Sequence, residues 1–427
     1  MSFLRSVPIG AVAMLWVLPV FAATPPNLQP NPPVATLAPA ALRSAIRQVW
    51  DLSPQIQAAQ FSVEAARARI RAAAQPLYNP TISIESENAD VDRRAASLSL
   101  TLDISGKRRA RVSKANADLL ISRARYDRLR RDLSTRWLQA WSRVKLATRQ
   151  RELGARRVAL MKRFDNLASK RLKVGDISSP ERDLAGLALG EALAQQAELI
   201  ANEVSVRTML QEIVGNAAVS MPTVPAGIPP ASHSIIARSL QELPEMRLAR
   251  ARQASAEART RIARRARIPD PTAGITAGRV RFGAITDRII GVSLSIPLPI
   301  LNTGRAEVEA VRSESMVVAA EVRSQRLLSQ AKRVGTKLRY EALRNADLAF
   351  RNGRSAAYLE RTRLLERLWR ASEISTSDYL VQLKQSLDTA LSGLQLQSQT
   401  WQAWFDYLST SGRLVDWLGQ RLPGASK

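Results

Sequence analysis

Four short segments of the chain alternate polar and apolar residues, the period of two that is expected for β-strands. The strands predicted from this pattern lie near 81–88, 97–104, 272–282 and 288–296. Each has one apolar and one polar face, which fits either a sheet over a soluble core or a barrel with lipid outside and water inside. A soluble sheet needs a covering layer, whereas the helical segments beside these strands are polar over most of their surface. The pattern therefore favours a membrane barrel.

Two proline-free helical segments, 108–173 and 305–370, follow the strand pairs. At 1.5 Å per residue each is about 100 Å long. Their apolar residues recur at steps of three and four with Arg and Glu densely placed between them, a pattern typical of coiled-coil packing. Gly154 and Gly335 are the positions at which a break in these helices is expected. The chain is thus predicted to be mainly α with a small β part.

The order of the predicted elements occurs twice. Each copy has a helix, a strand pair, a glycine turn, the long helix, a polar turn and a closing helix. Pro54 and Pro244 are 190 residues apart, and Gly106 and Gly304, which precede the long helices, are 198 residues apart. The pattern predicts a first repeat at 42–216, a Pro- and Ser-rich linker at 217–234, a second repeat at 235–410 and a C-terminal tail at 411–427.

The first residues indicate export. A short basic start, an apolar stretch at 7–18 and a small-residue cleavage site after Ala22 predict a signal peptide at 1–22. The Pro-rich segment 23–41 is expected to be an extended leader. No apolar run reaches the roughly 18 residues that a membrane-spanning helix needs. An exported chain with amphipathic strands is expected in the outer membrane of a Gram-negative bacterium, extending into the periplasm.

Charge and rare residues exclude several classes of function. The chain has 63 Lys and Arg against 37 Asp and Glu, a formal net charge of +26. These basic residues are interleaved with acidic ones and form no basic tail or zinc-finger spacing, so solvated helix faces explain them better than nucleic-acid binding. The chain has no Cys, and its single His is His233 in the linker, which excludes thiolate and histidine metal sites. We predict no enzyme activity, no cofactor and no metal site.

The predicted strands cannot close a barrel within one chain, because the smallest closed examples have about eight strands. Lipid does not tolerate an open sheet edge, since its backbone groups would be unpaired. Two chains would give a filled eight-stranded barrel, and three would give a twelve-stranded barrel with room for a channel. Transport favours three chains, so a homotrimer embedded in outer-membrane lipid is expected.

The alternation also assigns the faces of such a barrel. The residues expected to face lipid are Ile82, Ile84, Leu98, Leu100, Leu102, Ile104, Val292, Leu294 and Ile296. The residues expected to face the lumen are Ser99, Thr101, Ser293, Ser295, Glu85 and Glu87. For the two glutamates a position at the rim or in a loop is the alternative. Loops are expected at 88–95 and 281–287. The aromatic girdle typical of such barrels is nearly absent, with Tyr78 and Phe282 near the strands.

Three stretches carry a resemblance to a known family: Asn79-Pro80, 102–108 with the sequence Leu-Asp-Ile-Ser-Gly-Lys-Arg, and 294–304 with the sequence Leu-Ser-Ile-Pro-Leu-Pro-Ile-Leu-Asn-Thr-Gly. With the duplicated order of elements, the chain from about residue 42 to 408 resembles outer-membrane efflux proteins of the TolC family. The last two stretches are similar to the branch that serves heavy-metal pumps of the cobalt-zinc-cadmium and copper-silver type. The resemblance implies a trimeric 12-stranded outer-membrane β-barrel continued by a periplasmic α-helical coiled-coil tunnel.

The resemblance also implies where partners bind. In this family, helix–turn–helix tips at the far end of the tunnel meet a periplasmic adaptor (membrane fusion protein), which links the channel to an inner-membrane pump. By position, the adaptor-docking tips of this chain are Lys173, Val174, Gly175, Asp176, Arg370, Ala371, Ser372 and Glu373. Ser372 departs from the family pattern, which has Gly at that position in both tips.

Acidic and polar residues just past the tips close the periplasmic aperture in this family. Glu181 and Asp378 match these positions. The alternative for both carboxylates is that they complement the dipole at a helix N-terminus. Lys and Arg residues also crowd the first tip between 162 and 173, where an acidic adaptor surface would dock; a solvated surface is the alternative.

The sequence therefore predicts the outer-membrane channel component of a tripartite efflux pump. It would be a passive exit duct for substrate, above all heavy-metal cations, delivered by an inner-membrane pump and a periplasmic adaptor. Energy must come from the pump, because the chain has no Gly-x-x-x-x-Gly-Lys-Ser/Thr nucleotide-binding loop. The alternatives are a type I secretion outlet, or a periplasmic coiled-coil adaptor or structural protein without a barrel.

Overall fold

The computed structural model describes residues 37–88, 91–215, 219, 221–225, 227–353, 358–371 and 373–419. The chain divides into two units, Met1–Pro33 and Val34–Lys427, and all described residues belong to the second. The expected signal peptide, most of the expected leader and the end of the expected tail lie outside the described residues.

The described elements follow the predicted order in both halves. The first half contains α1 (Ala40–Leu52), α2 (Pro54–Ala74), β1 (Thr81–Asn88), β2 (Asp92–Thr101), α3 (Lys107–Lys173) and α4 (Ser179–Val214). The second half contains the short 3₁₀ turns η1 (Ser232–Ser234) and η2 (Leu240–Glu242), then α5 (Pro244–Ala266), β3 (Thr272–Phe282), β4 (Ile285–Ser295), α6 (Arg305–Asn352), α7 (Tyr358–Arg370), α8 (Thr376–Thr410) and α9 (Leu414–Trp417). The prediction of a mainly helical chain with a small antiparallel sheet is confirmed.

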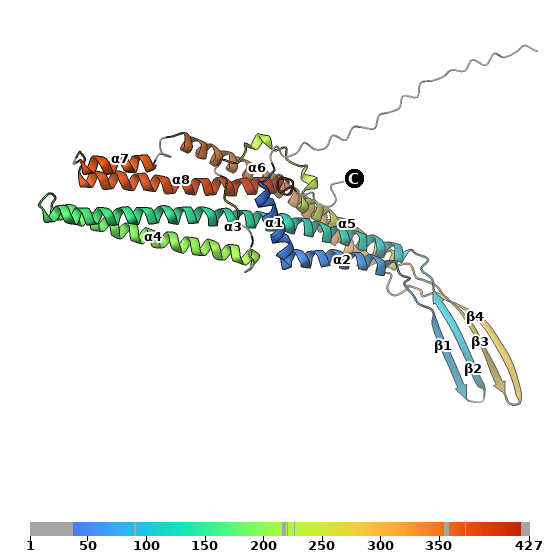
Figure 1. The fold of residues 1–427 in the computed structure, drawn as a ribbon. Coiled ribbons are helices and arrows are strands. Elements are labelled where there is room, and N and C mark those ends of the chain that lie inside the picture. The colour runs from blue at the N-terminus through green and yellow to red at the C-terminus, as the bar shows by residue number, and fades with distance from the viewer. Residues whose placement is uncertain are drawn as a thin grey trace, which may run out of the picture. The chain divides into compact units, whose positions relative to one another are not determined.

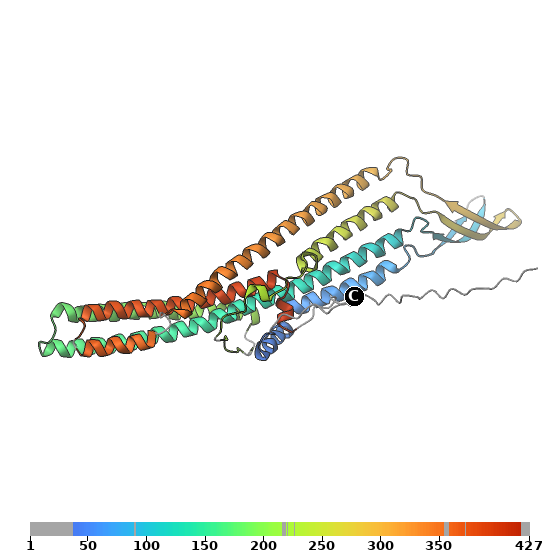
Figure 2. The same cartoon turned by 90° about the horizontal axis from the view of Figure 1, so that it is seen from above.

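The helices form hairpins around α3. Towards one end α3 packs against α4, and towards the other it packs against α2 and α5 (Figure 1). Seen from above, α6 runs beside α5 towards the sheet, and the α7–α8 hairpin lies beside the α3–α4 hairpin (Figure 2). The strands β1 to β4 extend from the end of the helices that is opposite to the α3–α4 and α7–α8 turns (Figure 1). The sheet and the two helix–turn–helix tips therefore lie at opposite ends of this unit.

Three helix boundaries differ from the sequence-based expectation. Only the first long helix is continuous, since the second ends at Asn352 and a new helix starts at Tyr358. The expected breaks at Gly154 and Gly335 do not occur, because both glycines lie inside helices. At Gly154 a Cβ atom would lie 2.6 Å from Leu199 Cδ1, so this glycine allows α3 to approach α4 closely. The third difference is α5, which begins at its N1 residue Pro244 rather than near residue 235.

The main hydrophobic core gathers aromatic side chains from α1, α3, α6, α8 and α9. The largest fully buried members are Trp137, Trp141, Trp404, Tyr340 and Phe405. The rings of Trp137 and Trp141 stack with centroids 6.1 Å apart. A second buried cluster lies near the tips, where Phe164, Trp369 and Tyr379 join helices of both halves. Burial of such large apolar surfaces is the main favourable term in folding.

The segments before, between and after the repeats pack on the main core. Ala38, in the expected leader, is buried, and its N–H donates to the Trp417 carbonyl at 2.8 Å. The linker accepts a hydrogen bond at the Pro222 carbonyl from Trp141 Nε1 at 2.8 Å. The expected tail also differs from a free extension, because its residues Leu414, Trp417 and Leu418 are core members.

The four strands form one antiparallel sheet in the order β1-β2-β3-β4. The register aligns Ile82, Leu98, Ile275 and Val292 across the sheet, and these four side chains share one face. The opposite face carries Ser, Thr and Gly, for example Ser99 opposite Thr81. Many of the apolar side chains are exposed, including Val292 at 87%. Among the described residues, β1 and β4 have no second strand neighbour, so the sheet has two open edges.

The strand ends correct the expected loops and faces. β2 begins at Asp92 rather than near residue 97, and the turn after β3 is shorter than the expected loop 281–287. The sequence hid these ends because Asp, Arg and Ala have a low strand propensity. Leu102 and Ile104 lie beyond β2, and Ile296 lies beyond β4, so strand alternation does not assign their faces.

A small polar cluster joins the sheet to the helices and explains the stretch 102–108. The Asp103 carboxylate accepts hydrogen bonds from the N–H groups of Lys107 and Arg108, both at 2.8 Å, which starts α3. Gly106 has a φ of 74°, in the left-handed region. The Lys107 ammonium lies 2.8 Å from Asp270 Oδ2 just before β3, and the Tyr78 hydroxyl donates to the same oxygen at 2.8 Å. Residues from both halves thus fix the start of the sheet.

Substitution of Gly393 on α8 is expected to destabilise the helical body. A Cβ atom at this position would press on the ring of Phe350, lying 2.6 Å from its Cζ, so α8 and α6 must separate. We expect Gly393→Ala to lower stability by about 1–3 kcal/mol, the usual cost of overpacking. This loss opposes the roughly 1 kcal/mol that Ala gains over Gly in a helix.

The matched control is Gly190→Ala on α4, where a Cβ atom meets nothing within 4 Å. Thermal unfolding in detergent, followed by tryptophan fluorescence, should give a lower midpoint for Gly393→Ala and an unchanged or higher midpoint for Gly190→Ala. Equal midpoints for the two variants would contradict the close packing of α8 on α6.

Candidate functional site

The first tip is an exposed helix–turn–helix. α3 ends at Lys173, and α4 begins at Ser179. The turn is closed by two backbone hydrogen bonds, from Gly175 N to Leu172 O at 3.0 Å and from Asp176 N to Arg171 O at 2.9 Å. Gly175 has a φ of 79°, which favours glycine. All four predicted docking residues of this tip are exposed: Lys173, Val174, Gly175 and Asp176.

The second tip closes with the same hydrogen-bond pattern. Its Glu373 N–H donates to the Leu368 carbonyl at 2.9 Å, five residues earlier, as Asp176 does in the first tip. Arg370, Ala371 and Glu373 are exposed, whereas Ser372 lies outside the described residues. The two turns thus present similar surfaces at the same end of the helices (Figure 1).

The predicted aperture residues are the N-terminal capping residues of α4 and α8. Glu181 Oε2 accepts from Ser178 N and Ser178 Oγ, both at 2.9 Å, and Ser178 caps the helix in return. These bonds from Ser178 hold the pKa of the Glu181 carboxyl below its usual range. In α8, Asp378 N donates to Ser375 Oγ at 3.0 Å, and that hydroxyl donates to Asp378 Oδ2 at 2.7 Å. The helix-terminus alternative therefore describes the geometry of both carboxylates within one chain.

A polar network between the two repeats lies along the helices above the tips. The Arg157 side chain of α3 is buried, and its guanidinium lies 3.3 Å from Asp388 Oδ1 on α8 and 3.8 Å from Glu191 Oε1 on α4. It also donates to Gln195 Oε1. The Lys384 ammonium of α8 donates to Glu191 Oε1 at 2.5 Å, and this bond holds the pKa of the Glu191 carboxyl below its ordinary value. α3, α4 and α8 are thus joined by charge-assisted hydrogen bonds.

A second link joins the tips themselves. The Arg171 guanidinium lies 4.8 Å from the ring centroid of Trp369, a cation–π distance, and donates to the Arg370 carbonyl at 3.4 Å. Neither link was found from the sequence. Each of their residues looks like an ordinary charged residue on a helix face until the fold brings the repeats together.

The predicted lumen residues Glu85 and Glu87 lie on the face of the sheet opposite to Ile82 and Ile84. Both are exposed, and both lie within β1 rather than in a loop. Glu87 is directly opposite Arg93 on β2, whereas Glu85 is opposite Ala95. The two carboxylates therefore share the polar face with serine and threonine residues of the neighbouring strands.

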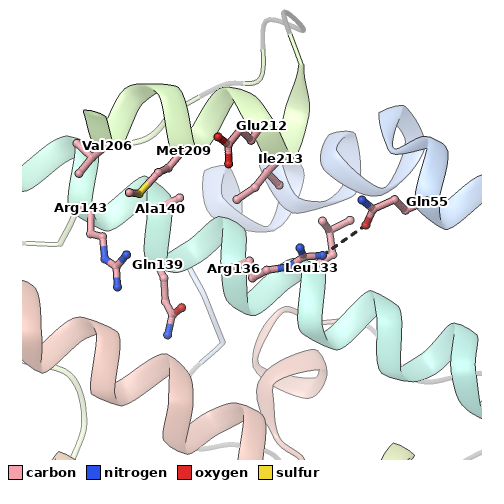
Figure 3. Close-up of a pocket in the computed structure, with 10 residues that line it drawn as sticks. All are labelled: Gln55, Leu133, Arg136, Gln139, Ala140, Arg143, Val206, Met209, Glu212 and Ile213. Carbon is pink, nitrogen blue, oxygen red and sulfur yellow. Dashed lines mark hydrogen bonds between the residues drawn. The ribbon is translucent and has the colours of Figure 1, made fainter. Parts of the chain in front are cut away.

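A pocket of about 320 Å³ lies between α3 and the end of α4 (Figure 3). Its polar side chains are committed to bonds between elements. Arg136 donates to Gln55 Oε1 at 3.4 Å, Gln139 donates to Asp406 Oδ1 at 2.8 Å, and Arg143 donates to Gln402 Oε1 at 3.0 Å. The ten lining residues include no Ser, Thr, Cys, His or Lys, so this pocket contains no pair of nucleophile and base. It acts as packing between helices.

Two searches over the described part of the chain gave negative results. No group of three or more His, Cys, Asp or Glu side chains there is arranged to hold a metal ion. His233 lies exposed in η1. No helix in the described part combines the length and apolar character needed to cross a membrane.

Comparison with known proteins places the chain in a family. Residues 45–216 match the family model described as Outer membrane efflux protein. The chain is 23% identical over 311 residues to the cobalt-zinc-cadmium resistance protein CzcC of Cupriavidus metallidurans, covering 69% of this chain and 72% of CzcC. The structure is similar to a membrane protein from Pseudomonas aeruginosa, with a TM-score of 0.73, 17% identity, and coverage of 88% of this chain and 94% of that one. It also resembles the CmeC outer membrane channel of Campylobacter jejuni, with a TM-score of 0.72, 14% identity, and coverage of 88% and 86%.

The fold is thus that of outer-membrane channels, with a small sheet at one end of long helical hairpins. Together with the family match in the first repeat, this identifies the chain as an outer membrane efflux protein. The expected family and the expected location in the outer membrane are confirmed. Membership of a family of passive channels also supports the expectation that the chain is no enzyme.

The capping of α4 yields a prediction about the first tip. Replacing an N-cap serine by alanine removes the bond that satisfies a free backbone N–H and costs about 1 kcal/mol. We expect Ser178→Ala to speed hydrogen exchange of the first-turn amides of α4 about fivefold, which corresponds to that free energy. Ser179→Ala, one residue further and without a capping bond, is the matched control. Exchange measured by mass spectrometry should change in the first variant alone; equal exchange in both would refute the capping role.

Proposed function

We propose that this protein is the outer-membrane channel component of a tripartite efflux pump, a passive exit duct for substrate delivered by an inner-membrane pump and a periplasmic adaptor. The observation that carries the proposal is the amphipathic sheet with two open edges, continued by helical hairpins that end in exposed tips. An open edge in lipid is costly, so these strands need strands from other chains. A periplasmic adaptor or structural protein would not need such a sheet.

The proposed assembly is a homotrimer with a 12-stranded β-barrel. β4 of one chain would pair with β1 of the next, so that four strands from each of three chains close the barrel. The apolar face with Ile82, Leu98 and Val292 would face lipid, and the face with Ser99, Glu85 and Glu87 would line the lumen. The helical hairpins of the three chains would form the periplasmic coiled-coil tunnel.

The adaptor would dock on the two tips. Lys173, Val174, Gly175 and Asp176 form the first contact surface, and Arg370, Ala371, Ser372 and Glu373 form the second. The shared turn geometry supports equivalent contacts at both tips, since the backbone of each presents the same hydrogen-bonded loop. The basic residues before the first tip would favour an acidic adaptor surface.

The proposed substrates are heavy-metal cations. Support comes from the similarity to CzcC, a cobalt-zinc-cadmium resistance protein by name, over 69% of the chain. Selection of the metal would take place in the partner proteins. Deleting the gene in its own bacterium should raise the cellular content of cobalt, zinc or cadmium when that metal is supplied. Unchanged contents of all three would contradict the metal assignment and leave the channel assignment standing.

The first test of the channel is the mass of the protein extracted in detergent from the outer-membrane fraction. We expect a trimer by native mass spectrometry, because three chains pair every open strand edge. Addition of this species to a planar lipid bilayer should give ion conductance. A monomer, or recovery in the soluble periplasmic fraction, would contradict the shared barrel.

Opening of the periplasmic end would require α4 and α8 to separate. In one chain they are joined through Glu191, Lys384 and Arg157, so we propose that this network holds the closed state. Glu181 and Asp378 would act further out, as the carboxylates that narrow the aperture. Adaptor docking at the tips would supply the free energy to break these bonds.

The gate network predicts a pH effect on conductance. Because its bond to Lys384 lowers the pKa of Glu191, ionised Glu191 stabilises the closed state above the ordinary pKa of a glutamate. This contribution is lost as the pH falls through the lowered value, so conductance in planar bilayers should rise in acid. Lys384→Ala should raise conductance at neutral pH and weaken the acid response.

The control for this prediction is Lys332→Ala, an exposed lysine of α6 outside the network. It should leave conductance unchanged. The double variant Glu181→Ala/Asp378→Ala tests the aperture residues in the same recordings, with higher conductance expected at neutral pH. Wild-type conductance in Lys384→Ala would remove the network from the gate, and wild-type conductance in the double variant would remove the carboxylates.

A further inference from the structure

A row of arginines crosses the sheet on its apolar face. The register places Arg94 of β2 opposite Arg279 of β3, and Arg279 opposite Arg288 of β4. Directly opposite residues in antiparallel strands point to the same side, and their Cβ atoms are about 5 Å apart. Two residues further along each strand lie Ala96, Ala277 and Ile290, so the arginines share the face of the apolar residues.

These positive charges are poorly compensated. Like charges directly opposite each other destabilise a sheet unless an opposite charge lies between them. Asp92 lies 3.4 Å from the Arg94 guanidinium, and both side chains are exposed to solvent, at 30% and 62%. Arg279 and Arg288 form no ion pair with any described residue. The carboxylates of Glu85, Glu87 and Asp287 are on the opposite face. The row therefore has room and charge for an anion.

The surface beside the row has the shape and polarity of a site for hydrocarbon. A hollow of about 530 Å³ is lined by the three arginines together with Ala96 and Ala277. The same two alanines also line a second, apolar hollow of about 400 Å³, whose other walls include Ile82, Leu98, Ile275, Ile290 and Val292. The small side chains thus connect a cationic hollow to an apolar one. A ligand that fills both has an anionic head and a hydrocarbon tail.

The position of the row along the strands agrees with a membrane interface. Arg94 is eight residues from Leu102, about 27 Å along a strand and about 20 Å along the membrane normal at the usual tilt of roughly 40°. The apolar band of such barrels is about 25 Å tall, so the arginines lie at its edge. The strand turns nearby are at the far end of the sheet from the helices (Figure 1). With the helices in the periplasm, this is the outer-leaflet side.

We propose that Arg94, Arg279 and Arg288 bind the phosphate groups of an outer-leaflet glycolipid, whose acyl chains lie in the adjoining apolar hollow. The proposal rests on the proposed function, because it requires the sheet to stand in the outer membrane. Guanidinium groups suit phosphate because they form bidentate charge-assisted hydrogen bonds. The lipid neutralises three opposed arginines, and the arginines fix the depth of the sheet in the membrane.

The test is the affinity of the full-length, detergent-extracted oligomer for fluorescent bis-phosphorylated lipid A in dodecyl maltoside micelles, measured by thermophoresis. We expect Arg94→Gln/Arg279→Gln/Arg288→Gln to weaken binding at least tenfold. The matched control is Arg305→Gln/Arg312→Gln/Arg323→Gln, which removes three exposed arginines of α6 outside the sheet and should leave affinity unchanged. The same glycolipid without phosphates should bind the wild-type oligomer at least tenfold more weakly.

Each other outcome overturns the site. Equal affinity in the two triple variants would show that the row does not bind the lipid. Displacement of the lipid by inorganic phosphate at equal concentration would assign the arginines to a free anion. If the triple variant fails to assemble, Arg279→Gln alone should still weaken binding about threefold, and an unchanged affinity would refute the proposal. Native mass and conductance of the wild type separate these results from failure of the channel assignment, since a true channel without this site keeps both.

Discussion

The unpaired backbone at the two edges of the sheet is the constraint on which the architecture depends. Four strands with an exposed apolar face are unstable alone in water and, with open edges, are unstable in lipid. Both problems are solved when neighbouring chains pair their edge strands. The proposed trimer, its lumen and the lipid-facing surface all follow from that pairing. The chain's own task is therefore to hold its strands so that the edges stay available to the next chain.

The cluster of Tyr78, Lys107 and Asp270 performs that task. It joins the segment before β1, the start of α3 and the segment before β3, so both hairpins leave the helices at fixed positions. At the other end, Arg157, Glu191 and Lys384 join the helices by bonds that are more exposed and therefore easier to break. The contrast between a buried junction at the sheet and a solvated network near the tips suits a channel that is fixed in the membrane and opens at its periplasmic end.

The sequence was sufficient for the elements and their order, because alternation, proline and glycine positions act locally. Pro54, Pro244, Gly106 and Gly304 each lie at the helix start that their chemistry predicts. The start of β2 at Asp92 was hidden because its first residues extend as strand only when β1 and β3 pair with them. The Arg157 network and the arginine row were also hidden. Their members are 30 to 230 residues apart and become neighbours only through the packing of the two repeats.

The bond between the Ala38 N–H and the Trp417 carbonyl bears on how such a chain matures. The main core takes residues from both ends of the described chain, and β2 pairs with β3 across about 170 residues of sequence, a high contact order that slows folding. The core around Trp137 cannot close before Leu418 has crossed the inner membrane. Folding must therefore follow translocation rather than accompany it. The whole chain, with its exposed strands, passes through the periplasm as an unfolded client that depends on holding chaperones.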